Sequence, residues 1–314
     1  MKFAMMFPGQ GSQSVGMLAE LAATDAVVGE TFAEASSALG YDLWQLCQQG
    51  PEERLAETER TQPAMLAAGV AVWRAWQRRG GTQPATLAGH SLGEYTALVC
   101  GGAIAFGYAV RLVQVRGQAM QHAVPAGSGA MAAILGLDDA QIEAACAEAA
   151  QGEVVQPVNY NAPGQLVIAG HAAAVARAID ACKAHGARRT VLLPVSVPSH
   201  SALMQPAAEA LRGRLAVIAV TAPVIRVYAF DGVLYATSDA IRDGLYRQLF
   251  NPVRWSAIVA AMIADGARCL VECGPGKVLA GLARRAPGGR ELDIHAVDGP
   301  ATLAAALAAA SEVA

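Results

Sequence analysis

Uninterrupted hydrophobic runs alternate along this chain with longer stretches in which apolar residues recur at helical spacing. Residues 3–7 form one such run, stopped by Pro8-Gly9, and residues 85–88 form another, so both are predicted to be buried strands. Strands that alternate with helices in this way indicate an α/β fold with a mostly parallel sheet and helices on both faces. Helical spacing fills the segments around the two runs, at residues 17–21, 27–39, 64–79, 92–104 and 106–122.

The pattern changes at residues 124–129, a cluster rich in proline, glycine and serine that is typical of a linker. We expect a larger core, residues 1–127 and 195–314, that is interrupted by a smaller subdomain, residues 128–194. The elements predicted in this subdomain follow the order βαββαβ of a ferredoxin-like unit: strands 130–136, 154–160, 165–169 and 189–194, and helices 138–150 and 172–185.

The mixed strand and helix pattern of the core returns after residue 195. Asp231-Gly232 joins two short extended pieces, 224–230 and 233–236, in a hairpin-type turn. Residues 269–272 are predicted to form a further buried strand. Helices are predicted at 202–215, 240–250, 255–264, 277–285 and 300–312.

Composition narrows the class of protein. The chain has 314 residues, 54% of them hydrophobic and 16% charged, with a net charge of −3. Such a chain is compact and globular, and without a basic stripe we expect no binding to nucleic acid. The longest uncharged stretch, 117–137, contains polar residues, proline and glycine, so we expect no membrane span. The first apolar run is too short for a signal peptide, and we expect a soluble, cytoplasmic protein.

The cysteines give no sign of a metal site. Six are present and none forms a C-x-x-C pair. Cys269 and Cys273 stand four residues apart, but no second pair or histidine cluster in the sequence completes a ligand set. We therefore expect free cysteines in a reducing compartment and no metal.

Candidate chemistry centres on the G-x-S-x-G pattern Gly89-His90-Ser91-Leu92-Gly93, which joins the second predicted strand to a helix. In this context a sharp turn exposes the serine as a nucleophile. The glycines permit the strained turn, and the N–H of Leu92 at the helix start points toward any oxyanion formed there. The pattern alone is a weak signal, since the alternative is a tight turn without chemistry.

A serine nucleophile needs a base within hydrogen-bond reach, and the chain has six histidines. His200 is favoured because it lies in a loop just past an apolar strand, at a helix start. The alternative for His200 is a histidine that caps this helix. His90 adjoins Ser91, but neighbours at a turn rarely face one another. The others are predicted to end a helix, to start one or to follow a short strand: His122, His185, His171 and His295.

Two further features have alternative interpretations. Arg116 interrupts an apolar helical face at 110–120, and its spacing favours an arginine that reaches out to solvent. The alternative is a guanidinium held in a pocket for a carboxylate. The glycine-rich loop at 8–13 lacks the spacing of a phosphate-binding loop, but a backbone N–H there could still donate to an oxyanion.

Eight short blocks in a fixed order cover nearly the whole chain. They are FPGQGSQ at 7–13, TQPA at 61–64, GHSLGEY at 89–95, RG at 116–117, NYNAPGQ at 159–165, VPSHSALM at 197–204, QLFNPV at 248–253 and ECGPGKVL at 272–279. In these blocks the sequence resembles the malonyl-CoA:acyl carrier protein transacylase family of bacterial fatty-acid synthesis. Each block is modest, but eight in order are very specific.

The resemblance implies an α/β-hydrolase-like core and roles for particular residues. Ser91 is the acylated nucleophile and His200 its base. The backbone carbonyl of Gln248 orients His200 and replaces the aspartate of a Ser-His-Asp triad. Backbone N–H groups of Gln10 and Leu92 form the oxyanion hole. The implied substrate-binding residues are Arg116, which pairs with the malonyl carboxylate, and Gln62, Asn161 and Gln165, which line the cleft.

The implied reaction moves a malonyl group from malonyl-CoA to the phosphopantetheine thiol of acyl carrier protein through a malonyl-serine intermediate. Malonyl-CoA is a substrate, no cofactor or metal is implied, and we expect a monomer. Acyl carrier protein is acidic, so a basic patch should dock it. The candidates for this docking patch are Lys183, Arg188, Arg189, Arg284 and Arg285.

Other functions remain open at this point. The same serine could serve a thioesterase or hydrolase, although Arg116 and the missing triad acid speak against that. The transferase could serve a malonate decarboxylase or a polyketide pathway, and a non-catalytic acyl-binding subunit is a further alternative. Residues 225–232 depart from the family pattern, so Tyr228 or Phe230 could alter the walls of the cleft.

Overall fold

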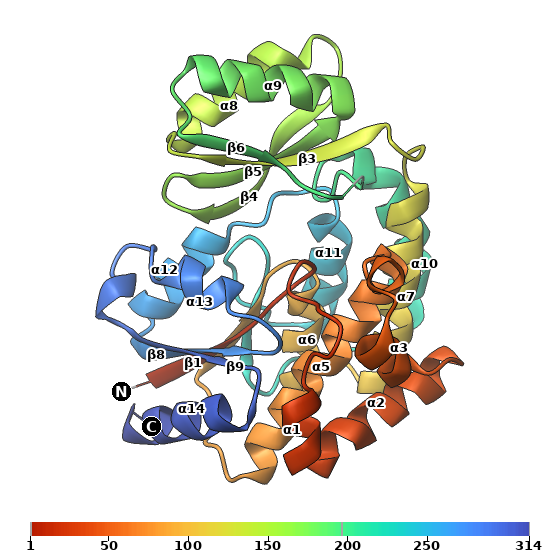
Figure 1. Cartoon of the computed structure of the whole chain (residues 1–314), viewed down its shortest axis with the longest axis vertical. Coiled ribbons are helices and arrows are strands. Elements are labelled where there is room, and N and C mark those ends of the chain that lie inside the picture. The colour runs from red at the N-terminus through yellow and green to blue at the C-terminus, as the bar shows by residue number, and fades with distance from the viewer. Residues whose placement is uncertain (1, 196, 314) are drawn as a thin grey trace.

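A parallel sheet with strand order β7-β2-β1-β8-β9 forms the centre of the larger core (Figure 1). The computed structural model describes residues 2–195 and 197–313; Met1, Ser196 and Ala314 lie outside the described residues. Every neighbouring pair of strands in this sheet is parallel, which confirms the expected α/β core. The strands are β1 (Lys2–Phe7), β2 (Thr86–Gly89), β7 (Arg226–Tyr228), β8 (Ala267–Cys273) and β9 (Asp293–Val297).

Helices cover both faces of this sheet. Around β8, for example, α12 and α13 lie on one side and α14 on the other (Figure 1). Within residues 2–195 and 197–313, no helix has both the length and the apolar character needed to cross a bilayer. The core helices are α1 (Ala19–Thr24), α2 (Ala26–Leu39), α3 (Leu43–Gln49), α4 (Glu52–Leu55), α5 (Thr58–Arg78), α6 (Gly93–Cys100), α7 (Phe106–His122), α10 (Gln205–Val217), α11 (Ser238–Gln248), α12 (Trp255–Ala264), α13 (Val278–Ala283) and α14 (Pro300–Val313), with short 3₁₀ helices at Ala202–Met204 and Gly289–Glu291.

The inserted segment forms an antiparallel sheet of strand order β4-β5-β3-β6, with two helices on one face (Figure 1). This is the strand order of a ferredoxin-like unit, as the pattern predicted. Its elements are β3 (Gly129–Leu135), α8 (Asp139–Ala150), β4 (Val155–Ala162), β5 (Gln165–His171), α9 (Ala172–Ala184) and β6 (Arg189–Leu192).

Strand β4 ties the small sheet to the core. The Tyr160 N–H donates to the Val253 carbonyl at 2.9 Å, and the Val253 N–H donates to the Val158 carbonyl at the same distance. Val253 lies just before α12, so the end of β4 is held next to the core. This attachment brings Asn161 toward the turn that carries Ser91.

Several element predictions were wrong in detail. The short helices α3 and α4 and the strand β9 were missed, and His295 lies inside β9 rather than after a strand. Edge strand β9 alternates Asp293 and His295 with apolar residues, so it lacks the continuous apolar run that identified β1. Helix α5 begins six residues earlier than the residue 64 expected, and it contains Pro63. The second half of the predicted hairpin forms a single bridge, between Tyr228 and Leu234.

Candidate active site

Ser91 stands at the turn between β2 and α6 with a backbone φ of 53°. A positive φ is costly for a residue with a side chain and persists where the surrounding structure enforces it. The two glycines of the pattern allow the chain to fold back closely. A Cβ on Gly89 would overlap the backbone of Gly93, and a Cβ on Gly93 would overlap the carbonyl of Phe7 at the end of β1.

Replacing Gly93 by alanine is expected to lower the free energy of unfolding by about 2–4 kcal/mol, because the Phe7 carbonyl cannot move without disturbing β1. Chemical denaturation measures this loss. The matched control is Gly213→Ala in α10, where a Cβ meets nothing within 4 Å, so stability should stay unchanged or rise by up to about 1 kcal/mol. Equal stability of the two variants would contradict the close packing of this turn.

His200 is buried, with 2% of its surface exposed, and it also has a positive φ, of 65°. Its Nε2 lies 2.7 Å from the Ser91 Oγ, and its Nδ1 lies 2.7 Å from the backbone carbonyl oxygen of Gln248. A carbonyl oxygen only accepts, so Nδ1 carries the hydrogen and Nε2 accepts from the Ser91 hydroxyl. The following 3₁₀ helix begins after Ser201 and has no side-chain cap, so the capping alternative for His200 was wrong.

The electrostatic environment keeps His200 unprotonated. Burial, together with the positive charge of Arg116, lowers the pKa of His200 to about 3. Since an imidazole must be neutral to accept a proton, His200 is available as a base throughout the neutral pH range.

Two backbone donors lie at the same turn. Gly9, the residue before Gln10, packs against it so closely that a Cβ there would lie 2.5 Å from the His90 carbonyl oxygen and 3.8 Å from the Leu92 nitrogen. Within the described part of the chain, the N–H groups of Gln10 and Leu92 have no hydrogen-bond partner. Free N–H groups beside a nucleophile can stabilise an oxyanion.

Arg116, on α7, is only 1% exposed. Nη1 donates to Gln62 Oε1 at 2.9 Å, and Nη2 donates to Gln248 Oε1 at 2.9 Å and to the Ser91 Oγ at 3.4 Å. Among the described residues, no carboxylate lies within 4.0 Å of this guanidinium, and its Nε has no partner. The prediction from spacing, an arginine reaching solvent, was therefore wrong. A buried cation without a direct ion pair can bind an anionic group.

Comparison with known proteins agrees with this geometry. The chain matches the acyl transferase domain family over residues 4–291. It belongs to this family. A malonyl CoA-acyl carrier protein transacylase of Escherichia coli strain K12 is 60% identical over 307 residues, 98% of this chain and 99% of that one. A transacylase of the same name from Bacillus subtilis strain 168 is 42% identical over 310 residues, covering 98% and 96% of the two chains.

Solved structures of acyltransferases share the fold. An acyl carrier protein S-malonyltransferase from Vibrio cholerae superposes with a TM-score of 0.95 at 58% identity, covering 97% of this chain and 99% of that one. A malonyl-transacylase in complex with a type II polyketide synthase acyl-carrier protein has a TM-score of 0.97 at 55% identity, covering 98% and 100%. The resemblance found in the sequence is thereby confirmed.

The polar residues that the acyltransferase resemblance implied for the cleft differ in their contacts. Gln62, on α5, is fully buried, and its Oε1 accepts a hydrogen bond from Arg116 Nη1. Asn161, on β4, accepts at Oδ1 a hydrogen bond from His90 Nε2 at 2.9 Å, so it holds the residue before Ser91. Gln165 begins β5, and among the described residues its side chain has no hydrogen bond to Ser91, His200 or Arg116.

Sequence reasoning assigned no role to Glu94. Its carboxylate is fully buried in the first turn of α6 and accepts hydrogen bonds from the Tyr235 hydroxyl and, at 2.8 Å, from Gln248 Nε2. Burial raises the pKa of Glu94 to about 7. The signal that could have revealed Glu94 is an acidic residue placed in an apolar helix directly after the nucleophile pattern.

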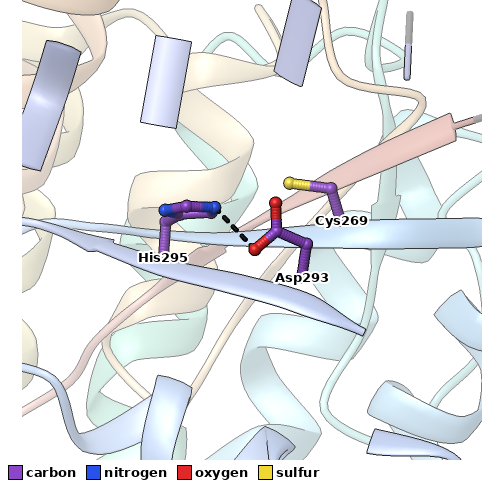
Figure 2. Close-up of side chains that lie close together, drawn as sticks. All are labelled: Cys269, Asp293 and His295. Atoms are coloured by element: carbon purple, nitrogen blue, oxygen red, sulfur yellow. Dashed lines mark ion pairs between the residues drawn. The ribbon is translucent and has the colours of Figure 1, made fainter. Parts of the chain in front are cut away.

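One other cluster has donor atoms suited to a metal ion. Cys269, Asp293 and His295 lie together on β8 and β9, with the carboxylate between the thiol and the imidazole (Figure 2). Their donor atoms lie within 4.8 Å of one another, a grouping that the sequence did not reveal. His295 Nε2 pairs with Asp293 at 2.8 Å, and burial raises the pKa of the Cys269 thiol to about 12, so a metal ion would have to replace this pair and displace the thiol proton.

The atypical segment 225–232 contacts other parts of the core. The Tyr228 hydroxyl donates to Asp265 Oδ2 at 2.7 Å, beside an ion pair of that carboxylate with Arg226. Phe230 is buried, with the Arg247 guanidinium 5.6 Å from its ring centre. Neither side chain contacts the catalytic candidates through these interactions.

Proposed function

We propose that this protein transfers the malonyl group of malonyl-CoA to the phosphopantetheine thiol of an acyl carrier protein of fatty-acid biosynthesis. The observation that carries the proposal is the buried, counter-ion-free Arg116 beside the Ser91–His200 pair, with Nη2 3.4 Å from the Ser91 Oγ. A serine nucleophile alone would fit many acyl groups, but a buried guanidinium at this distance selects an acyl group with a free carboxylate. The names of the relatives agree with this activity.

In the first half-reaction Ser91 attacks the thioester carbonyl of malonyl-CoA and gives its proton to His200 Nε2. The oxyanion lies between the N–H groups of Gln10 and Leu92, each of which is typically worth about 2.7–4 kcal/mol in such a site. The C–S bond then breaks, and the coenzyme A thiolate leaves with the proton from His200. The Gln248 carbonyl keeps the hydrogen on Nδ1 throughout, so no buried acid is needed.

In the second half-reaction the phosphopantetheine thiol gives its proton to His200, and its sulfur attacks the malonyl ester. The C–O bond breaks and Ser91 recovers the proton, which gives ping-pong kinetics. Arg116 serves this cycle twice. It holds the malonyl carboxylate, and once paired it no longer lowers the pKa of His200 so strongly, so the base strengthens when the correct substrate is bound.

A transfer assay tests the proposal. The purified protein is mixed with malonyl-, methylmalonyl- or acetyl-CoA and holo acyl carrier protein, and mass spectrometry follows the carrier. We expect malonyl carrier protein as the main product. Rapid release of free malonate without carrier would instead indicate a hydrolase, and no covalent adduct would indicate an acyl-binding subunit.

The pathway that the protein serves depends on which carrier protein receives the malonyl group. One similar transacylase has been solved in complex with a polyketide synthase carrier protein, so carriers of both pathways have to be compared. Comparing carriers from fatty-acid and polyketide synthesis in the same assay separates these two roles. A transfer confined to a malonate decarboxylase carrier would contradict both. We expect a monomer to be active, since one chain carries all the residues of the site.

For docking of the carrier we propose five exposed cations. Lys183 lies on α9, Arg188 and Arg189 lie just before and at the start of β6, and Arg284 and Arg285 follow α13. Reversing the charge of Arg188 and Arg189 together should raise the KM for carrier protein about tenfold and leave the KM for malonyl-CoA unchanged, because rim charges act on the protein partner. The control is Arg212→Glu on α10, whose side chain is 60% exposed. Equal rises in both KM values would contradict docking at this patch.

A further inference from the structure

Behind Ser91, a network of buried polar side chains connects three helices of the core and the loop that carries Tyr235. Glu94 on α6 accepts from the Tyr235 hydroxyl and from Gln248 Nε2, and Gln248 ends α11. The side chains of Glu94 and Gln248 are fully buried and Tyr235 is 8% exposed. The network reaches α7 through Arg116. Buried side chains that are linked by hydrogen bonds hold one another's orientation more strongly than isolated contacts do.

Gln248 is the centre of this network. Its Nε2 donates to the Ser91 carbonyl at 2.9 Å and to Glu94 Oε2 at 2.8 Å. Its Oε1 accepts from Arg116 Nη2 at 2.9 Å, and its backbone carbonyl accepts from His200 Nδ1. One residue therefore touches the nucleophile, the base and the cation that receives the acyl carboxylate.

The side-chain amide could in principle face either way, because its oxygen and nitrogen ends have nearly the same shape. If the amide were reversed, its NH₂ group would face the guanidinium of Arg116, donor against donor. Arg116 would then lose an acceptor and its fork would be free to turn. The orientation that supports Arg116 requires acceptors on the opposite side of the amide, and the carboxylate of Glu94 and the Ser91 carbonyl are those acceptors.

We propose that Glu94, held by Tyr235, is a positioning residue that fixes the amide of Gln248 and thereby aims Arg116 at the acyl carboxylate. This inference rests on the proposed malonyl transfer and adds to it. Glu94 does not contact Arg116 within 4.0 Å, so it acts through Gln248. Its effect should therefore appear in the discrimination between malonyl and acetyl groups, since only the malonyl group has a carboxylate for Arg116.

The test compares two substitutions of Glu94 in the intact protein. Glu94→Met fills similar space without an acceptor, and Glu94→Gln keeps an oxygen that can accept from Gln248 while its NH₂ faces Tyr235. We expect Glu94→Met to lower the ratio of malonyl to acetyl kcat/KM at least about tenfold. The substitution removes the hydrogen bond from Gln248 to a carboxylate, and the loss of a hydrogen bond to a charged group typically changes an equilibrium by about this factor. Glu94→Gln should retain the ratio within about threefold.

Tyr235→Phe gives a second variant that removes only one oxygen and so folds readily; it should lower the ratio about threefold. The matched control is Glu272→Met. Glu272 is also fully buried, but it accepts from the backbone N–H groups of Leu279 and Ala280, so its loss should reduce stability without changing the ratio.

An unchanged ratio in Glu94→Met and Tyr235→Phe would overturn the inference while leaving malonyl transfer intact. An equal loss of the ratio in Glu94→Gln and Glu94→Met would also overturn it, because an acceptor at this position would then not be what matters. A wild-type protein that transfers no malonyl group would refute the proposed function itself, and this outcome is recognised before any variant is made.

Discussion

Ser91→Ala is expected to abolish the covalent malonyl adduct and to reduce malonyl transfer by at least about 1,000-fold, because the hydroxyl 2.7 Å from His200 Nε2 is the atom that we expect to be acylated. The alanine retains the turn and the free N–H groups, so substrate binding should survive the change. Mass spectrometry of the intact protein after mixing with malonyl-CoA measures the adduct directly.

The control for this variant is Ser199→Ala, one residue before His200. This change removes a partly buried hydroxyl group that donates to the Val197 carbonyl at 3.5 Å. Its adduct should form as in the unmodified protein. If Ser91→Ala still acquired the malonyl mass in the same yield, the nucleophile would have to be a different residue.

Arg116→Ala is expected to lower kcat/KM for malonyl transfer at least about 30-fold while acetyl transfer changes less than about threefold. The physical reason is that removing one partner of a buried charge pair costs about 2–5 kcal/mol, and only the malonyl group supplies the other charge. Arg116→Lys should recover little of the loss, since an ammonium group cannot reproduce the planar two-pronged contact. Steady-state transfer kinetics with the two acyl-CoA substrates measure this split.

The same helix offers a matched control. Arg111 lies on α7 like Arg116, but it is exposed, so Arg111→Ala should leave both transfer rates unchanged. Equal losses of malonyl and acetyl transfer in Arg116→Ala would mean that the guanidinium supports the structure of the site and does not select the substrate.

Much of the fold follows from local pattern. The buried strands β1 and β2 are continuous apolar runs, so these strands were predictable. The subdomain was predictable because the order βαββαβ can be recognised in its sequence pattern. The missed elements lack such a signal. Helices α3 and α4 are only seven and four residues long, and β9 is an edge strand with polar residues in alternation.

The candidate site likewise has parts that the local sequence predicts and parts that depend on distant contacts. The sharp turn at Ser91 was predictable because such a turn needs glycines at fixed neighbouring positions, and five consecutive residues of the sequence meet this requirement. His200 was favoured from its loop, but its 2.7 Å contact with Ser91 joins residues 109 positions apart. The resemblance, and not the pattern of residues, supplied the roles of Gln248 and Arg116.

The sequence by itself determined the α/β fold, the inserted subdomain and the position of the candidate nucleophile, because hydrophobic periodicity and turn chemistry act over a few neighbouring residues. The tertiary structure alone decided that Arg116 is buried without a counter-ion and that Glu94 reaches it through Gln248. Those contacts join residues 132 and 154 positions apart. Whether a charged side chain is solvated or buried depends on which distant elements cover it, and spacing along one helix carries no information about that.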